Sequence, residues 1–334
     1  MKILVTGASG FLGSHLSRAL VGQGHLVRAL VRSSSPRVGL EGLSLQFAVG
    51  DLFDPPSLRA ATEGIDVVFH CAGQVARWRR ADHMIESHVQ GTRNVIAAAQ
   101  SSRVQRLIYT SSVASLGLPD RDRNPDGSFP KMDETHAWNT TRSVWPYGFA
   151  KHLAEQEVYR ALDDGLAAVI LNPSAVFGSG DVHRYHVGLV GRMLAGRLPP
   201  VAPPGGLNAI HIDDVVAGHL AALERGTPGF RYILGGENMT HVELLTQAAR
   251  ALGRTGPRLR IPGPPLRMLG RAAQAFCRWL PLPTWLGLFA MAGLHFYYDG
   301  TLAHDELGFE PQHTVSEAIT QAAAWFRAHG EDLE

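Results

Sequence analysis

A serine, a tyrosine and a lysine near the middle of the chain have the types and spacing needed for proton transfer. Tyr147 and Lys151 are four residues apart, so both lie on one face if this stretch is helical. Tyrosine has a pKa of about 10 and exchanges protons poorly at neutral pH, but a neighbouring ammonium group favours its ionised form. Ser112 follows an apolar stretch and can hydrogen-bond an oxygen on which charge develops. We therefore predict that Ser112, Tyr147 and Lys151 are catalytic.

The start of the chain favours this interpretation over an ordinary helix surface. Residues 2–5 form an apolar run that predicts a strand buried on both faces. Gly7, Gly10 and Gly13 follow at spacings of three, and apolar residues then recur at helical intervals. Such a turn lets backbone approach a pyrophosphate, whose charge lies at the positive end of the helix. A plain tight turn is the alternative, but the flanking strand and helix favour a dinucleotide site. The residues that we assign to it are Thr6, Gly7, Ser9, Gly10, Phe11, Leu12 and Gly13.

Strands and helices alternate through the first half of the chain. The predicted strands are residues 2–5, 26–31, 47–52, 67–73, 106–110 and 167–171, and the long helices are residues 82–101 and 147–162. This alternation predicts an α/β fold with a Rossmann-type doubly wound parallel sheet, whose ligand lies at the carboxyl ends of the strands.

Beyond Gly178 the alternation weakens. We expect the chain to return to the sheet at residues 209–214 and 231–234 and to end in a helix over 315–328. The rest predicts a smaller, mostly helical C-terminal substrate cap. Two domains follow: residues 1–178 with 206–235 bind the cofactor, and residues 179–205 with 236–334 form the cap.

The end of the second predicted strand indicates which dinucleotide binds. Folds of this kind that bind NAD place an acidic residue there, which hydrogen-bonds the adenosine 2′-hydroxyl. Here the strand ends in Arg32, followed by Ser33, Ser34 and Ser35. A guanidinium with hydroxyl groups beside it suits a 2′-phosphate. We expect NADP(H) to be preferred, bound through Arg32 and Ser33, with NAD(H) as the alternative; without a ligand this is an exposed basic turn.

The ends of the other strands supply further contacts. Asp51 and Leu52 could meet the adenine, and small residues after the fourth strand let backbone approach a ribose or the nicotinamide. The further cofactor contacts that we expect are Asp51, Leu52, Cys71, Ala72, Gly73, His88, Thr110, Tyr147, Lys151, Asn172, Pro173, Ser174 and Val176. On the substrate side we expect Ser112, Asn172 and Trp78; Trp78 either stacks on a planar substrate or starts the next helix in solvent. The long polar loop over 117–143 is expected at the substrate entrance.

Five short motifs are spread over essentially the whole chain. They are Thr-Gly-Ala-Ser-Gly-Phe-Leu-Gly from Thr6, Gly50-Asp51-Leu52, Thr110-Ser111-Ser112, Tyr147-x-x-x-Lys151 and His211-Ile212-Asp213-Asp214. Together they resemble the extended short-chain dehydrogenase/reductase superfamily, in its NAD-dependent epimerase/dehydratase family. Residues 27–32 resemble the dihydroflavonol 4-reductase branch, and residues 153–158 and 231–238 are similar to hopanoid-associated sugar epimerases.

The resemblance implies a role for each catalytic residue. Ser112 would polarise the substrate oxygen, Tyr147 would be the acid/base, and Lys151 would bind the ribose and tune Tyr147. His88 departs from the family pattern, which often has Asn at this position. His211, with the acidic residues after it, is expected to open a helix rather than to form a catalytic pair.

The composition excludes several classes of protein. The chain has 334 residues, of which 45% are hydrophobic and 18% charged, as in a globular protein with a substantial core. A net charge of +1 argues against a nucleic-acid binder that relies on bulk charge. Two cysteines, Cys71 and Cys277, are too few for a disulfide framework or a zinc site and suit a reducing cytoplasm. No signal peptide is expected, because the apolar start is the first strand.

Asp181, His183 and His186 could suggest a metal, but nothing else supports one and none is expected.

One interval is unusual in its charge. Between Glu243 and Asp299 there is no acidic residue, and the same interval contains seven arginines. A helix over 265–280 would place Arg267, Arg271 and Arg278 on one side and Leu269, Ala273, Phe276 and Leu280 on the other. The favoured interpretation is a cap whose apolar side covers the substrate pocket while the arginines face water. The alternative is peripheral attachment to an anionic membrane.

These observations predict a cytoplasmic, NADP(H)-dependent oxidoreductase. It would reduce a ketone or aldehyde, or oxidise the alcohol, by hydride transfer with Tyr147 as acid/base. The first alternative is an NAD(P)-dependent nucleotide-sugar epimerase or dehydratase, and the second is a non-catalytic protein that senses dinucleotides. The partners that we expect are a hydrophobic or anionic small molecule and no nucleic acid, with a homodimer left open.

Overall fold

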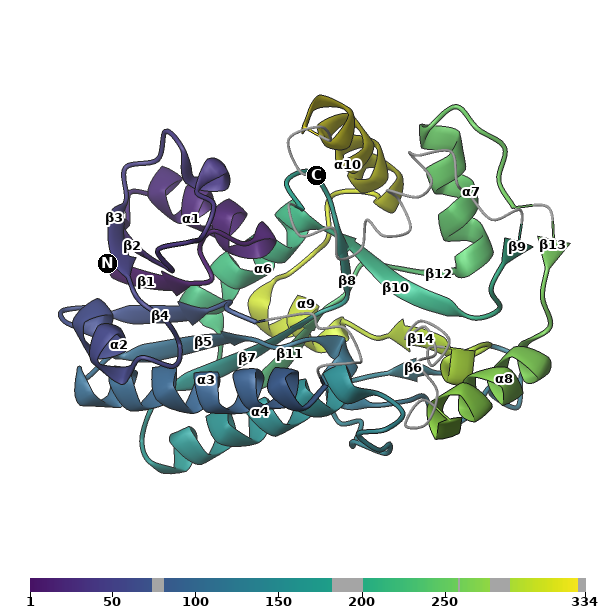
Figure 1. The fold of residues 1–334 in the computed structure, drawn as a ribbon, viewed down its shortest axis with the longest axis horizontal. Coiled ribbons are helices and arrows are strands. Elements are labelled where there is room, and N and C mark those ends of the chain that lie inside the picture. The colour runs from purple at the N-terminus through teal and green to yellow at the C-terminus, as the bar shows by residue number, and fades with distance from the viewer. Residues whose placement is uncertain (74–80, 182–200, 258, 277–288, 330–334) are drawn as a thin grey trace.

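The computed structural model describes residues 1–334 apart from 74–80, 182–200, 258, 277–288 and 330–334. Its centre is a sheet of seven strands in the order β11-β7-β5-β4-β1-β2-β3, with every neighbouring pair parallel (Figure 1). The strands are β1 (Lys2–Thr6), β2 (Leu26–Val31), β3 (Gln46–Val49), β4 (Val67–His70), β5 (Arg106–Thr110), β7 (Ala168–Pro173) and β11 (Arg231–Leu234). The predicted doubly wound sheet is confirmed, and its strand order reverses between β1 and β4, where such sheets bind ligands.

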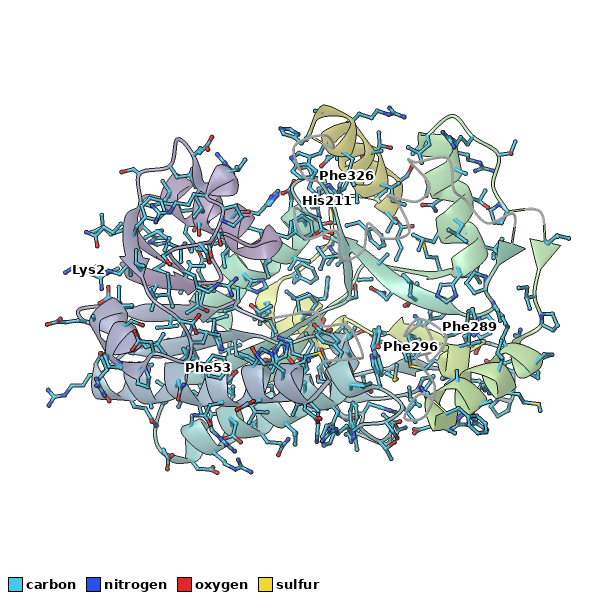
Figure 2. The ribbon with its side chains drawn as sticks, in the orientation of Figure 1. Lys2, Phe53, His211, Phe289, Phe296 and Phe326 are labelled. Atoms are coloured by element: carbon cyan, nitrogen blue, oxygen red, sulfur yellow. The ribbon has the colours of Figure 1, made fainter. Side chains whose placement is uncertain are left out.

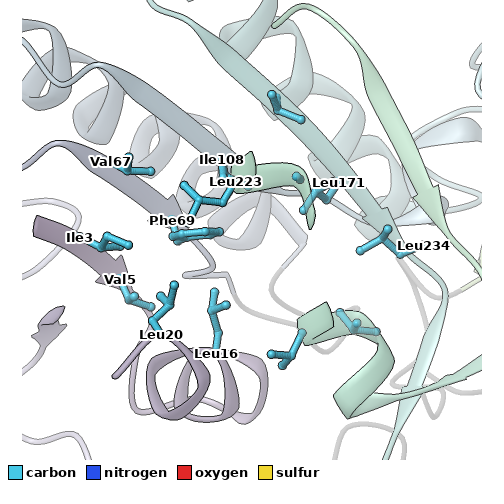
Figure 3. Packing of buried hydrophobic residues seen from close by; sticks show 14 of the residues in the cluster. Ile3, Val5, Leu16, Leu20, Val67, Phe69, Ile108, Leu171, Leu223 and Leu234 are labelled. Atoms are coloured by element: carbon cyan, nitrogen blue, oxygen red, sulfur yellow. The ribbon is translucent and has the colours of Figure 1, made fainter. Parts of the chain in front are cut away.

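Helices cover both faces of this sheet, which is why its strands are apolar on both sides. Ile3 and Val5 of β1 belong to the core under α1 (Phe11–Gly22), α6 (Ile212–Arg225) and α9 (Thr301–Leu307) (Figure 3). Leu4, between them, belongs to the core under α2 (Pro55–Thr62), α3 (Ala81–Ser101) and α4 (Pro146–Asp163). The alternation along one short strand thus supports two separate cores.

The C-terminal part adds a second, mixed sheet in the order β12-β10-β14-β6, with β8 paired to β10. Its strands are β6 (Lys131–Met132), β8 (Ala175–Phe177), β10 (Gly206–His211), β12 (Glu237–Thr240) and β14 (His295–Tyr298). Helices α7 (His241–Ala251) and α10 (Val315–His329) share one hydrophobic core with β8, β10 and β12. Beyond α7, β13 (Leu259–Arg260) pairs with β9 (Val201–Ala202), and α8 (Gly263–Phe276) follows. The C-terminal part of the chain therefore combines helices with a small mixed sheet.

The prediction that residues 209–214 return to the main sheet is wrong. The strand there, β10, pairs in parallel with β8 and β14 and antiparallel with β12. Strand β7 ends at Pro173, and the chain continues as β8 outside the main sheet, where it becomes the neighbour of β10. The sequence pattern of a strand followed by a helix is the same whichever sheet the strand joins. The local sequence around β10 therefore does not indicate which strands pair with it. The second predicted return is confirmed, because β11 pairs with β7.

The predicted helices are confirmed with small shifts at their ends. Helices α3, α4 and α10 match the predictions over 82–101, 147–162 and 315–328. The predicted helix over 265–280 is α8, which begins at Gly263; residues 277–280 lie outside the described ranges. His211 opens α6 as expected, since its Nδ1 accepts a hydrogen bond from the Asp213 amide at 3.0 Å. Among the described helices, none combines the length and hydrophobicity needed to cross a membrane.

Candidate active site

A large cavity, with a volume of about 1350 Å³, lies at the carboxyl ends of β1, β2, β4 and β5. It continues into the C-terminal part of the chain. Figure 2 labels Phe53 on the side of the main sheet and Phe289 and Phe296 on the side of β14, and all three line the cavity. One continuous space therefore joins the glycine-rich turn to an apolar chamber.

The turn between β1 and α1 requires its glycines for close backbone packing. Gly7 has a φ of 68°, and a Cβ there would lie 2.7 Å from Ala72 Cα. A Cβ on Gly13 would lie 2.1 Å from the Gly7 carbonyl oxygen, so the first turn of α1 packs directly on the loop. Gly10 is the N-cap and brings no side chain over the free N–H groups of the helix start. This cradle fits the pyrophosphate of a dinucleotide. The cavity is lined here by Gly7, Ser9, Gly10, Phe11, Leu12 and Gly13.

The ends of β2 and β3 form the next part of the wall. Arg32 is exposed and lines the cavity, together with Ser35. Ser33, which was expected to contact the cofactor, is exposed but does not line the cavity. Asp51 and Leu52 also line the cavity, at the position expected for an adenosine.

The structure brings the three predicted catalytic residues into the same cavity. Lys151 is buried; its Nζ donates a hydrogen bond to the Thr110 carbonyl at 2.9 Å and lies 5.2 Å from the centre of the Tyr109 ring. Burial lowers the pKa of the Lys151 ammonium to about 8, although the charges of Glu155 and Cys71 oppose the shift. The Ser112 hydroxyl accepts a hydrogen bond from the Ala114 amide at 3.2 Å, which fixes the side chain at the start of a short 3-10 helix, Val113–Leu116.

His88, on α3, lies against Tyr147, the predicted acid/base. The centroids of the His88 and Tyr147 rings are 5.9 Å apart and the rings are nearly perpendicular, at 74°. Gly73 makes this arrangement possible, because a Cβ there would lie 2.8 Å from His88 Cε1. His88 and Tyr147 thus form neighbouring parts of the cavity wall.

Thr6 supports the wall from behind rather than lining the cavity. Its Oγ1 is 2.7 Å from His70 Nδ1 and accepts a hydrogen bond from the Ala72 amide at 3.2 Å. Burial, and secondly the charge of Lys151, lower the pKa of His70 to about 3, so this ring is neutral. Burial raises the pKa of the neighbouring Cys71 thiol to about 11. Thr6 thereby holds the backbone at Ala72, which lines the cavity.

Asn172 also lies behind the wall. It is fully buried and is not one of the cavity-lining residues. Its Nδ2 donates hydrogen bonds to the Ser112 carbonyl at 3.0 Å and to Glu155 Oε1 at 2.7 Å. This placement favours a positioning role over direct contact with substrate or cofactor. The other residues that were expected to contact the cofactor and that do line the cavity are Cys71, Ala72, Gly73, His88, Thr110, Pro173, Ser174 and Val176.

The chamber beyond the three predicted catalytic residues is formed largely by side chains that were not predicted from the sequence. They are mostly aromatic or aliphatic: Trp145, Leu207, Ile261, Leu266, Phe289, Met291, Phe296 and Tyr298. Trp145 and Phe296 pack edge to face, with ring centroids 5.1 Å apart. Most of these residues belong to the acid-free interval between Glu243 and Asp299, whose apolar side was expected to cover the substrate pocket. Trp78, the predicted stacking residue, and His183 and His186 lie outside the described ranges.

Comparison with protein-family models identifies the chain. Residues 3–235 match the model of the NAD dependent epimerase/dehydratase family. The chain belongs to this family. It is 34% identical to a putative dihydroflavonol 4-reductase of Synechocystis, over 98% of this chain and 94% of that protein. It is 33% identical to sterol demethylase protein B of Methylococcus capsulatus, over 99% of both chains. Among solved structures, that of gox2253 superposes with a TM-score of 0.86 at 35% identity and covers 98% of both chains.

As a member of the epimerase/dehydratase family, the protein is an NAD(P)-dependent enzyme of the extended short-chain dehydrogenase/reductase type. The family resemblance seen in the sequence motifs is thereby confirmed. A dinucleotide and a small-molecule substrate are the ligands that the family implies, and the cradle at Gly7 and Gly13 fits the first of them.

Proposed function

We propose that this enzyme is an NADP(H)-dependent oxidoreductase that reduces a bulky apolar ketone or aldehyde, or oxidises the corresponding alcohol. One observation carries the proposal. Ser112, Tyr147 and Lys151 line the cavity between the glycine cradle and a chamber of aromatic and aliphatic side chains. A sterol-related protein and a reductase among the relatives agree with an apolar carbonyl substrate.

The residues of the chain handle the proton and the developing charge. The bound dinucleotide would supply or accept the hydride at the carbonyl carbon. The hydroxyl groups of Ser112 and Tyr147 donate hydrogen bonds to the carbonyl oxygen, and Tyr147 gives up its proton as charge develops there. The Lys151 ammonium, held by the Thr110 carbonyl, stabilises the phenolate that remains.

The preference for NADP(H) rests on Arg32. Arg32 lines the cavity at the end of β2, as does Ser35, and its guanidinium can bind a 2′-phosphate. The test is a fluorescence titration of cofactor-free protein with NADPH and with NADH. We expect NADPH to bind more tightly than NADH. In Arg32→Ala, the ratio of the NADH Kd to the NADPH Kd should fall at least about tenfold. A preference for NADH would contradict this part of the proposal.

The substrate class is tested with a series of ketones of increasing apolar size, followed by NADPH oxidation. Bulky apolar ketones should give the highest kcat/KM, because the chamber is lined mostly by apolar side chains and offers few polar partners. If only nucleotide sugars are turned over, or if the cofactor cannot be removed, the epimerase alternative replaces the reductase.

Attachment to an anionic membrane is supported by the exposed face of α8. Met268, Leu269 and Phe276 are 73%, 50% and 56% exposed, contrary to the expectation that Leu269 and Phe276 cover the pocket. Arg267, instead of facing water, donates to the Ala292 carbonyl at 3.0 Å. An apolar face in an acid-free interval is suited to a lipid surface.

Vesicle binding tests this attachment. The protein should sediment with anionic liposomes at low salt, and Met268→Glu should weaken the binding; no binding to any vesicle would remove the idea. A cytoplasmic location, suggested by the use of only two cysteines, remains part of the same proposal.

A further inference from the structure

A buried carboxylate lies on the catalytic helix and has no role in the reaction described so far. Glu155 follows Lys151 by four residues and Tyr147 by eight, which places all three along one side of α4. Its residue is only 1% exposed. A carboxylate so removed from water must be compensated by hydrogen-bond donors and positive charge.

One oxygen of Glu155 holds the backbone around the catalytic serine. Oε1 accepts hydrogen bonds from Ser115 Oγ at 2.6 Å and from Asn172 Nδ2 at 2.7 Å. The same Asn172 amide nitrogen donates to the Ser112 carbonyl at 3.0 Å. Glu155 is therefore connected to both ends of the short turn that begins at Ser112.

The other oxygen reaches the loop on the substrate side. Oε2 lies 3.5 Å from Arg231 Nη1, and Arg231 also donates to the carbonyls of Glu134 at 2.7 Å and His136 at 2.8 Å. That loop leads to Trp145, which lines the apolar chamber. Through Arg231, the carboxylate ties the catalytic helix to the segment that shapes the substrate side.

We propose that Glu155 is a positioning residue for the proposed reaction, which fixes the Ser112 turn and the 133–145 loop against α4 and supplies the negative charge that keeps Lys151 protonated. The expected effect of Glu155 on turnover rests on the proposed function. The expected effect of Glu155 on the protonation of Lys151 does not, because it concerns the protein without substrate.

The electrostatic part follows from what surrounds the Lys151 ammonium. Burial lowers its pKa to about 8, and Glu155 is the first of the charges that oppose this shift. The other titratable groups around it are Cys71 and His70 at the end of β4, Tyr109 on β5, His88 on α3 and Tyr147 on α4. Because Glu155 has the largest opposing effect, loss of its charge should lower the pKa of Lys151 further.

The chain allows a direct measurement, because it contains three lysines, Lys2, Lys131 and Lys151. NMR of protein labelled with 13C at lysine Cε would show three titrating signals, with Lys151 assigned from a Lys151→Met variant. In Glu155→Gln, an isosteric amide without charge, we expect the Lys151 titration to move to lower pH by about half a unit or more. A Lys151 titration unchanged from that of the native protein would overturn the proposal.

Two further variants separate the alternatives. Glu157→Gln removes a charge from the same helix, where Glu157 pairs with Arg93 and Arg160, and should leave the Lys151 signal in place. Glu155→Asp keeps the charge, but its side chain is one methylene too short to reach Asn172. In this variant Lys151 should titrate as in the native protein, while kcat falls at least about fivefold and NADPH affinity is unchanged.

If Glu155→Gln fails to fold, an undiminished kcat in Glu155→Asp still contradicts the positioning role. Should no ketone be turned over by the native protein, the NMR result stands independently of the proposed reaction.

Discussion

The His88 ring stands edge-on to the Tyr147 ring, with centroids 5.9 Å apart, and the missing side chain of Gly73 leaves the space that His88 Cε1 occupies. A small residue shortly after β4 thereby limits how closely α3 approaches Tyr147, the predicted acid/base on α4. The relationship depends on packing between three separate elements. It leads to the first prediction.

Gly73→Ala should impair catalysis through this contact. The new Cβ would lie 2.8 Å from His88 Cε1 and 3.5 Å from Lys151 Nζ, so the imidazole must move. We expect kcat to fall by about tenfold or more, because small displacements of catalytic groups are costly. In a His88→Ala background the added methyl group has no ring to displace, so the same substitution should cost little more. Equal losses in both backgrounds would show that His88 is not involved.

Gly13→Ala should weaken cofactor binding. Its Cβ would lie 2.1 Å from the Gly7 carbonyl oxygen, which forces α1 away from the turn. NADPH affinity, measured by fluorescence, should fall by at least about tenfold, since the cradle depends on this close approach. Gly22→Ala is the matched control in the same helix, because nothing lies within 4 Å of a Cβ there. A Gly13→Ala protein that binds like the control would contradict the assignment of the cradle.

Tyr147→Phe should separate an enzyme from a dinucleotide sensor. The variant keeps the ring against His88 but has no hydroxyl to transfer a proton. Turnover should drop by about 10²-fold or more while NADPH affinity stays within about twofold. Steady-state kinetics and fluorescence titration on the same preparation measure both. Retained turnover would exclude Tyr147 as the acid/base.

Phe296→Ala should affect large substrates selectively. Phe296 lines the chamber and packs edge to face on Trp145. Removing it takes apolar contact from a bulky ketone, so kcat/KM for such ketones should fall by about tenfold while small ketones change little. Phe230→Ala is the control, because that side chain is 42% exposed and does not line the cavity. A uniform loss for ketones of all sizes would indicate general damage to the fold.

Acid should destabilise the fold through its buried histidines. Burial lowers the pKa of His70 to about 3 and that of His219 to about 4, against 6.5 in the unfolded chain. Below pH 6.5 the two histidines bind protons in the unfolded chain but stay neutral in the folded one. Their contribution to the free energy of unfolding is therefore complete above pH 6.5 and is lost as pH falls toward 4.

The free energy of unfolding, measured with urea, should therefore decrease between pH 7 and pH 5, by up to about 1.4 kcal/mol per pH unit for each ring. His70→Gln, although less stable at neutral pH, should show a shallower decrease. A stability that is flat over this range would contradict the neutral, buried state of both rings.

Much of the site could be predicted because it is encoded by short spacings. The strand, glycine turn and helix around Gly7 are contiguous in sequence, and the spacing of Tyr147 and Lys151 follows from the period of one helix. Their chemistry depends on residue type, which the sequence states directly. These are the parts that the structure places as expected, in one cavity.

Contacts between distant segments were decided only by the tertiary structure. Nothing local distinguishes a strand that joins β8 from one that joins the main sheet, so the partner of β10 was predicted wrongly. Likewise, Glu155 and Arg231 become neighbours, and Trp145 meets Phe296, only when helices and strands pack together. Local periodicity determines which elements form and which face of each is apolar. Which elements then meet depends on the packing and burial of the whole chain, because those free energies are shared among residues far apart in sequence.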